Sequence, residues 1–89
     1  MSATIESTAT GYRYLVKTPG ICAGNARVDG TRIPVNTVVI GVIRGDSLEE
    51  IIKDYPALTR AQIYECMAYY EDHREEIDPL IKINSDLFD

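Results

Sequence analysis

One histidine and two cysteines are the side chains of this sequence best suited to nucleophilic or acid–base chemistry. His73 lies in a charged run over residues 71–76, and Cys22 lies in a loop-like segment between Gly20 and Gly24. No serine or cysteine is spaced to meet His73 as a nucleophile, and Cys22 has no base near it in the sequence. We therefore expect no catalytic residue and interpret the chain as not being an enzyme.

Metal and nucleotide binding are also not expected. Two cysteines and one histidine cannot complete a four-ligand zinc site without carboxylates. Glu49, Glu50 and Asp54 gather on the outer face of one expected helix, where acids are usually solvated. The glycines of residues 20–24 lack the Lys-Ser/Thr pair of a phosphate-binding loop. We expect no cofactor, no metal and no small-molecule substrate.

Basic side chains are concentrated in the first half of the chain. The formal net charge is +3 over residues 1–45 and −8 over residues 46–89, and the sequence pI is near 4.7. This acidity argues against a protein whose main role is to coat nucleic acid. The candidate DNA contacts are Arg27, Arg32, Arg60 and Gln62.

The DNA assignment has alternatives at two places. Arg32 stands beside a tight turn, so its guanidinium could instead bond backbone carbonyls or a helix C-terminus. Glu65 and Asp72, on the same expected helix as Arg60, would repel phosphates.

Three further residues are candidates for binding a protein partner. Tyr64 and Tyr69 are expected to point away from the apolar stripe of their helix, and tyrosine is favoured at protein interfaces. The alternative is that both pack under the segment from Leu80 to Phe88. Arg74, near the far end of the same helix, is the candidate contact for an acidic partner site.

The elements that position these residues begin with a β-hairpin over residues 12–33. Residues 12–17 alternate with a period near two in β-favouring side chains, which predicts a strand. Asp29-Gly30 lies between two short β-like runs, a pattern typical of a type I′ hairpin turn. Residues 35–44 are rich in β-branched side chains, but their apolar spacing favours a buried helix that Gly45 ends.

Two capped helices follow. Ser47 and Glu50 predict a capping box for one helix, which Pro56 ends, and Thr59 and Gln62 predict a second capping box. The short connection between these helices predicts a helix-turn-helix arrangement. The last helix is expected to fray near Asp78-Pro79, because the residue before proline resists the helical region.

The expected fold is mainly α, with an N-terminal β-hairpin followed by a three-helix, homeodomain-like helix-turn-helix core. Residues 1–11 are expected to form a flexible arm, residues 12–80 a single domain with its helical core over 34–78, and residues 81–89 a C-terminal segment. No membrane span and no secretory signal are expected, so we expect a cytoplasmic protein.

The segment from Pro19 to Val35 resembles the signature of the domain-of-unknown-function family DUF433, whose core is Gly-Thr-Arg-Ile-Pro-Val, here residues 30–35. The resemblance covers about residues 12–80 and departs from the pattern at Ala23, where glycine is common, and at Ala26, where proline is common. Further matching runs are Ser47-Leu48-Glu49-Glu50-Ile51, Tyr55-Pro56-Ala57-Leu58-Thr59, Ala68-Tyr69-Tyr70 and Glu75-Glu76-Ile77-Asp78.

The resemblance implies a small bacterial or archaeal protein with a hairpin and a helix-turn-helix core. Many members are assigned as antitoxins that accompany a PIN-type nuclease toxin. It therefore implies an antitoxin of a type II toxin–antitoxin pair that silences its toxin and represses its own operon. Charge complementarity, and not the resemblance, is the basis for expecting Arg74 to enter the acidic metal site of the toxin. A homodimer is expected. The alternative is a stand-alone DNA-binding transcriptional regulator.

Overall fold

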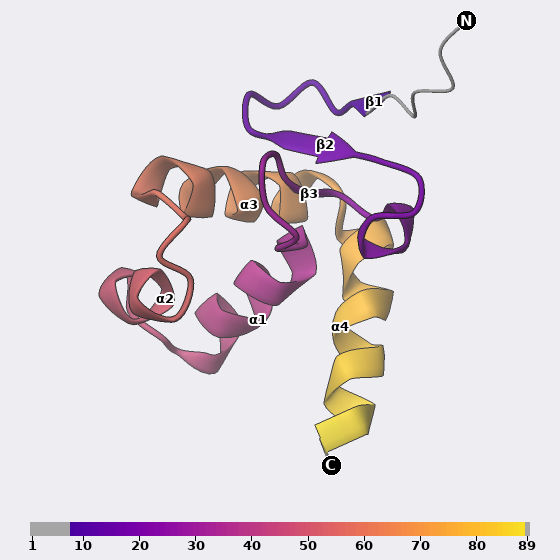
Figure 1. Ribbon diagram of the computed structural model, residues 1–89. Helices are drawn as coiled ribbons and strands as arrows, with labels where there is room; N and C mark the ends of the chain where they lie inside the picture. The colour runs from indigo at the N-terminus through magenta and orange to yellow at the C-terminus, as the bar shows by residue number, and fades with distance from the viewer. Residues whose placement is uncertain (1–7, 89) are drawn as a thin grey trace, which may run out of the picture.

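The computed structural model describes residues 8–88, and the side chains of residues 9–83. Figure 1 shows the strands on one side of α3 (Arg60–Asp72) and α1 (Val35–Arg44) on the other, with α4 (Arg74–Phe88) extending away from the body. Within the described residues three short strands and one 3-10 turn precede four α-helices: β1 (Thr8–Ala9), β2 (Leu15–Lys17), η1 (Cys22–Gly24), β3 (Arg27–Val28), α1 (Val35–Arg44), α2 (Leu48–Asp54), α3 (Arg60–Asp72) and α4 (Arg74–Phe88). The expected class, mainly helical with an N-terminal antiparallel hairpin, is confirmed.

The strands form one antiparallel sheet in the order β1-β2-β3, with Leu15 opposite Val28. The strand expected from residue 12 begins only at Leu15, because Thr10 Oγ1 donates to the Leu15 carbonyl and bends the chain before it. Residues 1–7 of the expected arm lie outside the described residues, and Thr8–Ala9 pairs as β1.

The turn at Asp29-Gly30 is not the expected type I′ turn. Gly30 has φ +81°, whereas Asp29 lies outside the left-handed region, and type I′ requires positive φ at both positions. Thr31 N–H donates to the Val28 carbonyl at 3.1 Å, and Thr31 Oγ1 accepts from Ile33 N–H at 3.1 Å. The threonine hydroxyl therefore takes the place of a ladder hydrogen bond and lengthens the loop.

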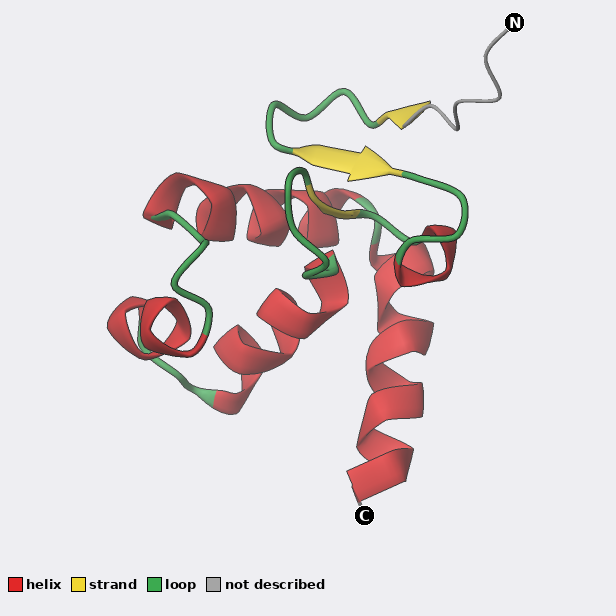
Figure 2. Cartoon of the chain, in the orientation of Figure 1, coloured by secondary structure: helices red, strands yellow, loops and turns green. Residues whose placement is uncertain are grey.

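The local signals for helix starts and stops are confirmed. Ser47 with Glu50 opens α2 and Thr59 with Gln62 opens α3, each as a complete capping box. Residues 35–44 form a helix and not a strand, and Gly45 ends it with φ +99°. The short loop between α2 and α3 gives the expected helix-turn-helix arrangement (Figure 2).

The expected end of the last helix near Asp78-Pro79 is wrong. The helix ends earlier, at His73, whose φ is −134° and ψ is +45°. A new helix, α4, begins at Arg74 and continues through Pro79 to Phe88. There are therefore four helices in the described residues and not three, and residues 81–88 of the expected C-terminal segment are part of α4. Apolar packing on both sides of the proline stabilises this helix: Ile77 is fully buried, and Leu80 and Ile81 pack against the core.

The core lies between the sheet, α1 and α3. Tertiary contacts join α1 to α3 and to α4, so α1 is the central helix. The buried apolar residues of the core come from β2, β3 and all four α-helices and from the loops between them: Leu15, Ala26, Val28, Val35, Val38, Val39, Ile51, Leu58, Ile63, Cys66, Tyr69, Tyr70 and Ile77.

A left-handed turn connects β2 and β3. Cys22 and Ala23 have φ of +51° and +55°, and Gly24 follows with φ +79°. Left-handed backbone costs a non-glycine residue roughly 1–2 kcal/mol. Ala23 is the position where the sequence departs from the glycine that is common in the resembled family, so the departure carries a conformational cost.

Candidate functional site

The outer face of α3 carries the most exposed large aromatic side chain among the described residues. Tyr64 is 61% exposed, and Ala61 and Ala68, three residues before it and four after it, are also exposed. Helix geometry places these three residues on one stripe. We call Ala61, Tyr64 and Ala68 the α3 stripe.

The charges at the ends of the α3 stripe are mostly neutralised or acidic. At the start of the helix, the guanidinium of Arg60 pairs with Glu49 of α2. Toward its end, Glu71 and Asp72 are exposed, and Glu71 lies 3.7 Å from Arg74. The stripe therefore offers an aromatic and small apolar surface with acidic residues beside it, which suits a protein better than a phosphate backbone.

Arg27, a candidate DNA contact, is buried and only 7% exposed. Its guanidinium donates to the Thr31 carbonyl at 2.8 Å and to Thr18 Oγ1 at 2.9 Å. The assignment of Arg27 to DNA is therefore corrected, because the side chain is used inside the hairpin and does not reach solvent.

The other DNA candidates lie at the surface or at its edge. Arg32 is exposed, and its backbone carbonyl accepts from Cys22 Sγ at 3.3 Å. Arg60 is held by Glu49, and the Gln62 side-chain oxygen accepts from Thr59 N–H in the capping box. Contacts of Arg32, Arg60 and Gln62 with DNA stay predictions.

The partner candidates separate into outer and inner residues. Tyr64 points outward as predicted, but the prediction for Tyr69 is wrong, because this side chain is only 2% exposed. Its ring lies 5.1 Å from the ring of Tyr12 and stacks on His73 at 4.1 Å between centroids. Tyr12 and His73 cover the face of α3 that helix periodicity predicts to be exposed to solvent.

Arg74 is 56% exposed at the start of α4. Its guanidinium lies 3.7 Å from Glu71 and 3.5 Å from Asp78, and it covers the ring of Tyr70 at 4.9 Å from the centroid. The cation is therefore accessible, and its present partners are exposed carboxylates of the same chain.

A hydrogen-bonded aromatic cluster at the α3–α4 break was not anticipated. The phenol of Tyr12 donates to Asp72, and the phenol of Tyr69 donates to Glu76 at 2.8 Å. The hydrogen bond to Asp72 raises the pKa of Tyr12 to about 12, and burial together with Glu76 raises the pKa of Tyr69 further. Both phenols stay protonated at neutral pH. The Tyr12 phenol fastens the segment before β2 to α3, and the Tyr69 phenol joins α3 to α4. The spacing of Tyr69 and His73, one helical turn apart, is the one local signal that could have indicated the stacking.

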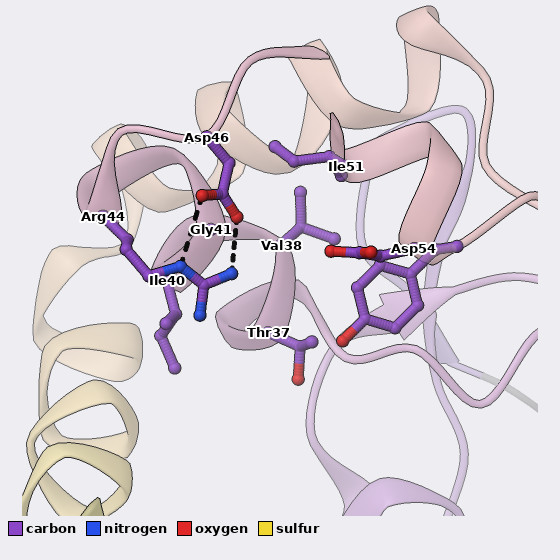
Figure 3. Close-up of a pocket in the computed structure, with 9 residues that line it drawn as sticks. Thr37, Val38, Ile40, Gly41, Arg44, Asp46, Ile51 and Asp54 are labelled. Carbon is purple, nitrogen blue, oxygen red and sulfur yellow. Dashed lines mark hydrogen bonds and ion pairs between the residues drawn. The ribbon is translucent and has the colours of Figure 1, made fainter. Parts of the chain in front are cut away.

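A pocket opens between α1 and α2 (Figure 3). The guanidinium of Arg44 pairs with Asp46 at one end, and this contact holds the pKa of the Asp46 carboxyl below its usual value. The pocket has a volume of about 270 Å³ and is lined by Thr37, Val38, Ile40, Gly41, Arg44, Asp46, Ile51, Asp54 and Tyr55.

Two kinds of feature are absent from residues 8–88. No group of three or more His, Cys, Asp or Glu side chains in this part of the chain is placed to hold a metal ion. None of the helices described there has the length and apolar character needed to cross a membrane.

Comparison with known proteins identifies the family of this chain. The family model described as "Protein of unknown function (DUF433)" matches residues 15–70. The chain belongs to the DUF433 family. The match includes α1, α2 and most of α3, with the whole α3 stripe, and it stops before α4.

A solved structure agrees with this assignment, and the chain is also similar to a curated relative. A DUF433 member protein from Anabaena variabilis is 39% identical, with a TM-score of 0.74 over 78% of this chain and 68% of that chain. The uncharacterized protein y4eO of Sinorhizobium fredii is 30% identical over 70 residues, which are 79% of this chain. This DUF433 chain spans 32% of the length of that relative.

Proposed function

We propose that this DUF433 chain is a protein-binding module that acts as an antitoxin, holding and silencing a nuclease-like toxin of the PIN type. The observation that carries the proposal is the exposed phenol of Tyr64 on the α3 stripe. Tyrosine offers a large, rigid, amphipathic contact area, and such residues often supply much of the energy of an interface.

The neighbours of Tyr64 support a close approach by a partner. Ala61 and Ala68 expose only methyl groups on either side of the phenol, so a partner surface can reach the helix backbone without displacing long side chains. Both ends of α3 are also fixed: the capping box holds its start, and the aromatic cluster holds its end. A rigid helix loses little conformational entropy when it binds.

The electrostatics favour a protein over DNA as the main partner. The net charge of −5 opposes a polyanion, and Arg27 is buried. Arg74 supplies the contact proposed for the acidic metal site of the toxin. Its exposed pairs with Glu71 and Asp78 each contribute only about 0–1 kcal/mol, so the guanidinium can exchange them for a carboxylate of the partner.

The proposal is tested by purifying the tagged chain from its native host, weighing the intact complex by native mass spectrometry, and assaying the ribonuclease activity of the separated partner. A stoichiometric partner whose activity falls when the chain is added back is the expected result. The same mass measurement tests the proposed homodimer.

Variants of Tyr64 and Arg74 locate the interface. Tyr64→Ala should weaken the complex by about tenfold or more, whereas Tyr64→Phe keeps the ring and should stay near wild type. Arg74→Glu should restore nuclease activity of the partner. A chain that purifies alone and binds its own promoter, with strong salt dependence, contradicts the proposal and supports the stand-alone DNA-binding regulator.

A further inference from the structure

The pocket between α1 and α2 has two polar ends and an apolar floor. Figure 3 shows the Arg44–Asp46 pair at one end and the Asp54 carboxylate at the other, with Val38, Gly41 and Ile51 between them. Val38 and Ile51 are 1% and 3% exposed, so the floor belongs to the rigid core. A pocket of about 270 Å³ is smaller than typical sites for drug-sized ligands, which hold about 300–1,000 Å³. It fits an object of the size of one long side chain.

Gly41 leaves the floor of the pocket without a side chain, although glycine destabilises the interior of a helix. Five of the six glycines have positive φ, and Gly41, in the interior of α1, is the exception. A Cβ at this position would lie 3.5 Å from Ile51 Cγ1 and 3.6 Å from Asp46 Oδ2, which are ordinary contacts. Neither backbone conformation nor packing therefore demands glycine, although glycine in a helix interior costs about 1 kcal/mol relative to alanine. Its missing methyl group leaves space in the pocket.

The charges of the pocket favour a cation. Asp46 is neutralised by Arg44, whose side chain is 63% exposed and extends toward solvent. The Asp54 carboxylate forms no ion pair with any of the described residues, although its charge reaches Arg44. The last turn of α1, including Gly41 and Arg44, also lines the pocket, and the C-terminal end of a helix attracts positive charge.

We propose that this pocket accepts an aliphatic cation, the side chain of a lysine or arginine supplied by the protein partner. The methylene stem lies on Val38, Gly41 and Ile51, and the ammonium or guanidinium group pairs with Asp54. The source of the side chain rests on the proposed function, whereas the cation preference of the pocket does not.

The preference is tested on the full chain alone with n-butylammonium and n-butylguanidinium, followed by NMR of the backbone amides. Both probes should shift the signals of Gly41, Ile51 and Asp54, while butanol and butyrate at the same concentrations should not. Asp54→Asn should weaken probe binding about fivefold, the worth of one exposed ion pair, and Asp29→Asn, which removes the same charge from a distant turn, should leave it unchanged. Equal binding of butanol and n-butylammonium overturns the proposal.

Gly41→Ala separates a binding role from a structural one. The variant should unfold about 4 °C higher, because alanine favours the helix, and should bind the probes more weakly because its methyl group enters the pocket. A variant that is less stable than wild type, or one that binds the probes equally well, contradicts the assignment.

The source of the cation is tested in the complex with the purified partner. Asp54→Asn should weaken that complex, and Asp29→Asn should not. If the chain binds the probes but Asp54→Asn leaves the affinity of the complex unchanged, the occupant is not a side chain of the partner. If no partner is found, the proposed function is wrong, and so is the proposal that a side chain of the partner occupies the pocket. The probe measurements on the chain alone still decide whether the pocket prefers a cation.

Discussion

The phenol of Tyr69 donates to the carboxylate of Glu76, whose two oxygens lie 2.8 and 2.9 Å from it across the break between α3 and α4. The Nζ of Lys17, on β2, lies 3.2 Å from the same carboxylate. Glu76 thus joins the sheet, α3 and α4 at one point. Because Tyr69 is buried and its ring stacks on His73, this contact links the end of α3 to the first turn of α4.

Removing the Tyr69 hydroxyl should destabilise the fold. Tyr69→Phe keeps the ring but loses a hydrogen bond to a charged group, which is worth about 2 kcal/mol. The measurement is the free energy of unfolding from urea titration followed by circular dichroism. Tyr64→Phe removes the same atom from an exposed ring and should change the stability by less than about 0.5 kcal/mol. Equal losses in the two variants would show that the Glu76 contact contributes nothing.

The raised tyrosine pKa values predict a loss of stability in alkali. The pKa of Tyr12 rises from 10.0 to about 12 in the folded chain, so between these values the unfolded chain has released a proton that the folded chain retains. The free energy of unfolding is therefore at its full value below pH 10 and falls as the pH rises toward 12. Urea midpoints across this range should decrease, and the decrease should be shallower in Tyr12→Phe. The same slope in both proteins would contradict the role of Tyr12.

Arg27 should matter for stability rather than for DNA. Arg27→Met keeps the aliphatic stem but leaves the Thr31 carbonyl and Thr18 Oγ1 without this donor, and should lower the free energy of unfolding by about 2 kcal/mol. Arg32→Met removes the same charge from an exposed position and should have an effect below about 0.5 kcal/mol. Thermal unfolding of the two variants side by side measures the difference. A larger effect of Arg32→Met would reverse the assignment.

Glycine should be preferred at position 23. Ala23→Gly relieves a left-handed alanine with φ +55° and should stabilise the chain by about 1 kcal/mol. Ala68→Gly places the same change in the exposed interior of α3 and should destabilise it by about 1 kcal/mol. Opposite signs of the two shifts in thermal midpoint are the expected result. A destabilising Ala23→Gly would mean that the turn is not strained.

The features that depend on neighbours within about one helical turn could be predicted from the sequence alone. The capping boxes at Ser47 and Thr59, the stop at Gly45 and the outward position of Tyr64 follow from local hydrogen bonds and from helix periodicity. The signature around residues 30–35, in combination with Tyr55-Pro56 and the other matching runs, also indicated the DUF433 family, which the family model confirms.

Which polar side chains are covered depends on contacts that form only in the folded chain. Tyr69 has the local pattern of a surface residue, but Tyr12 and the first turn of α4 close over it. The sequence alone suggests that Arg27 is an exposed cation, but in the folded chain its guanidinium bonds Thr18 and Thr31. The pocket forms because α2 packs beside Gly41 of α1. These outcomes depend on contacts between distant segments, which chain periodicity does not encode, and the burial of apolar side chains such as Ile77 also outweighs the local preference of Pro79 to end a helix.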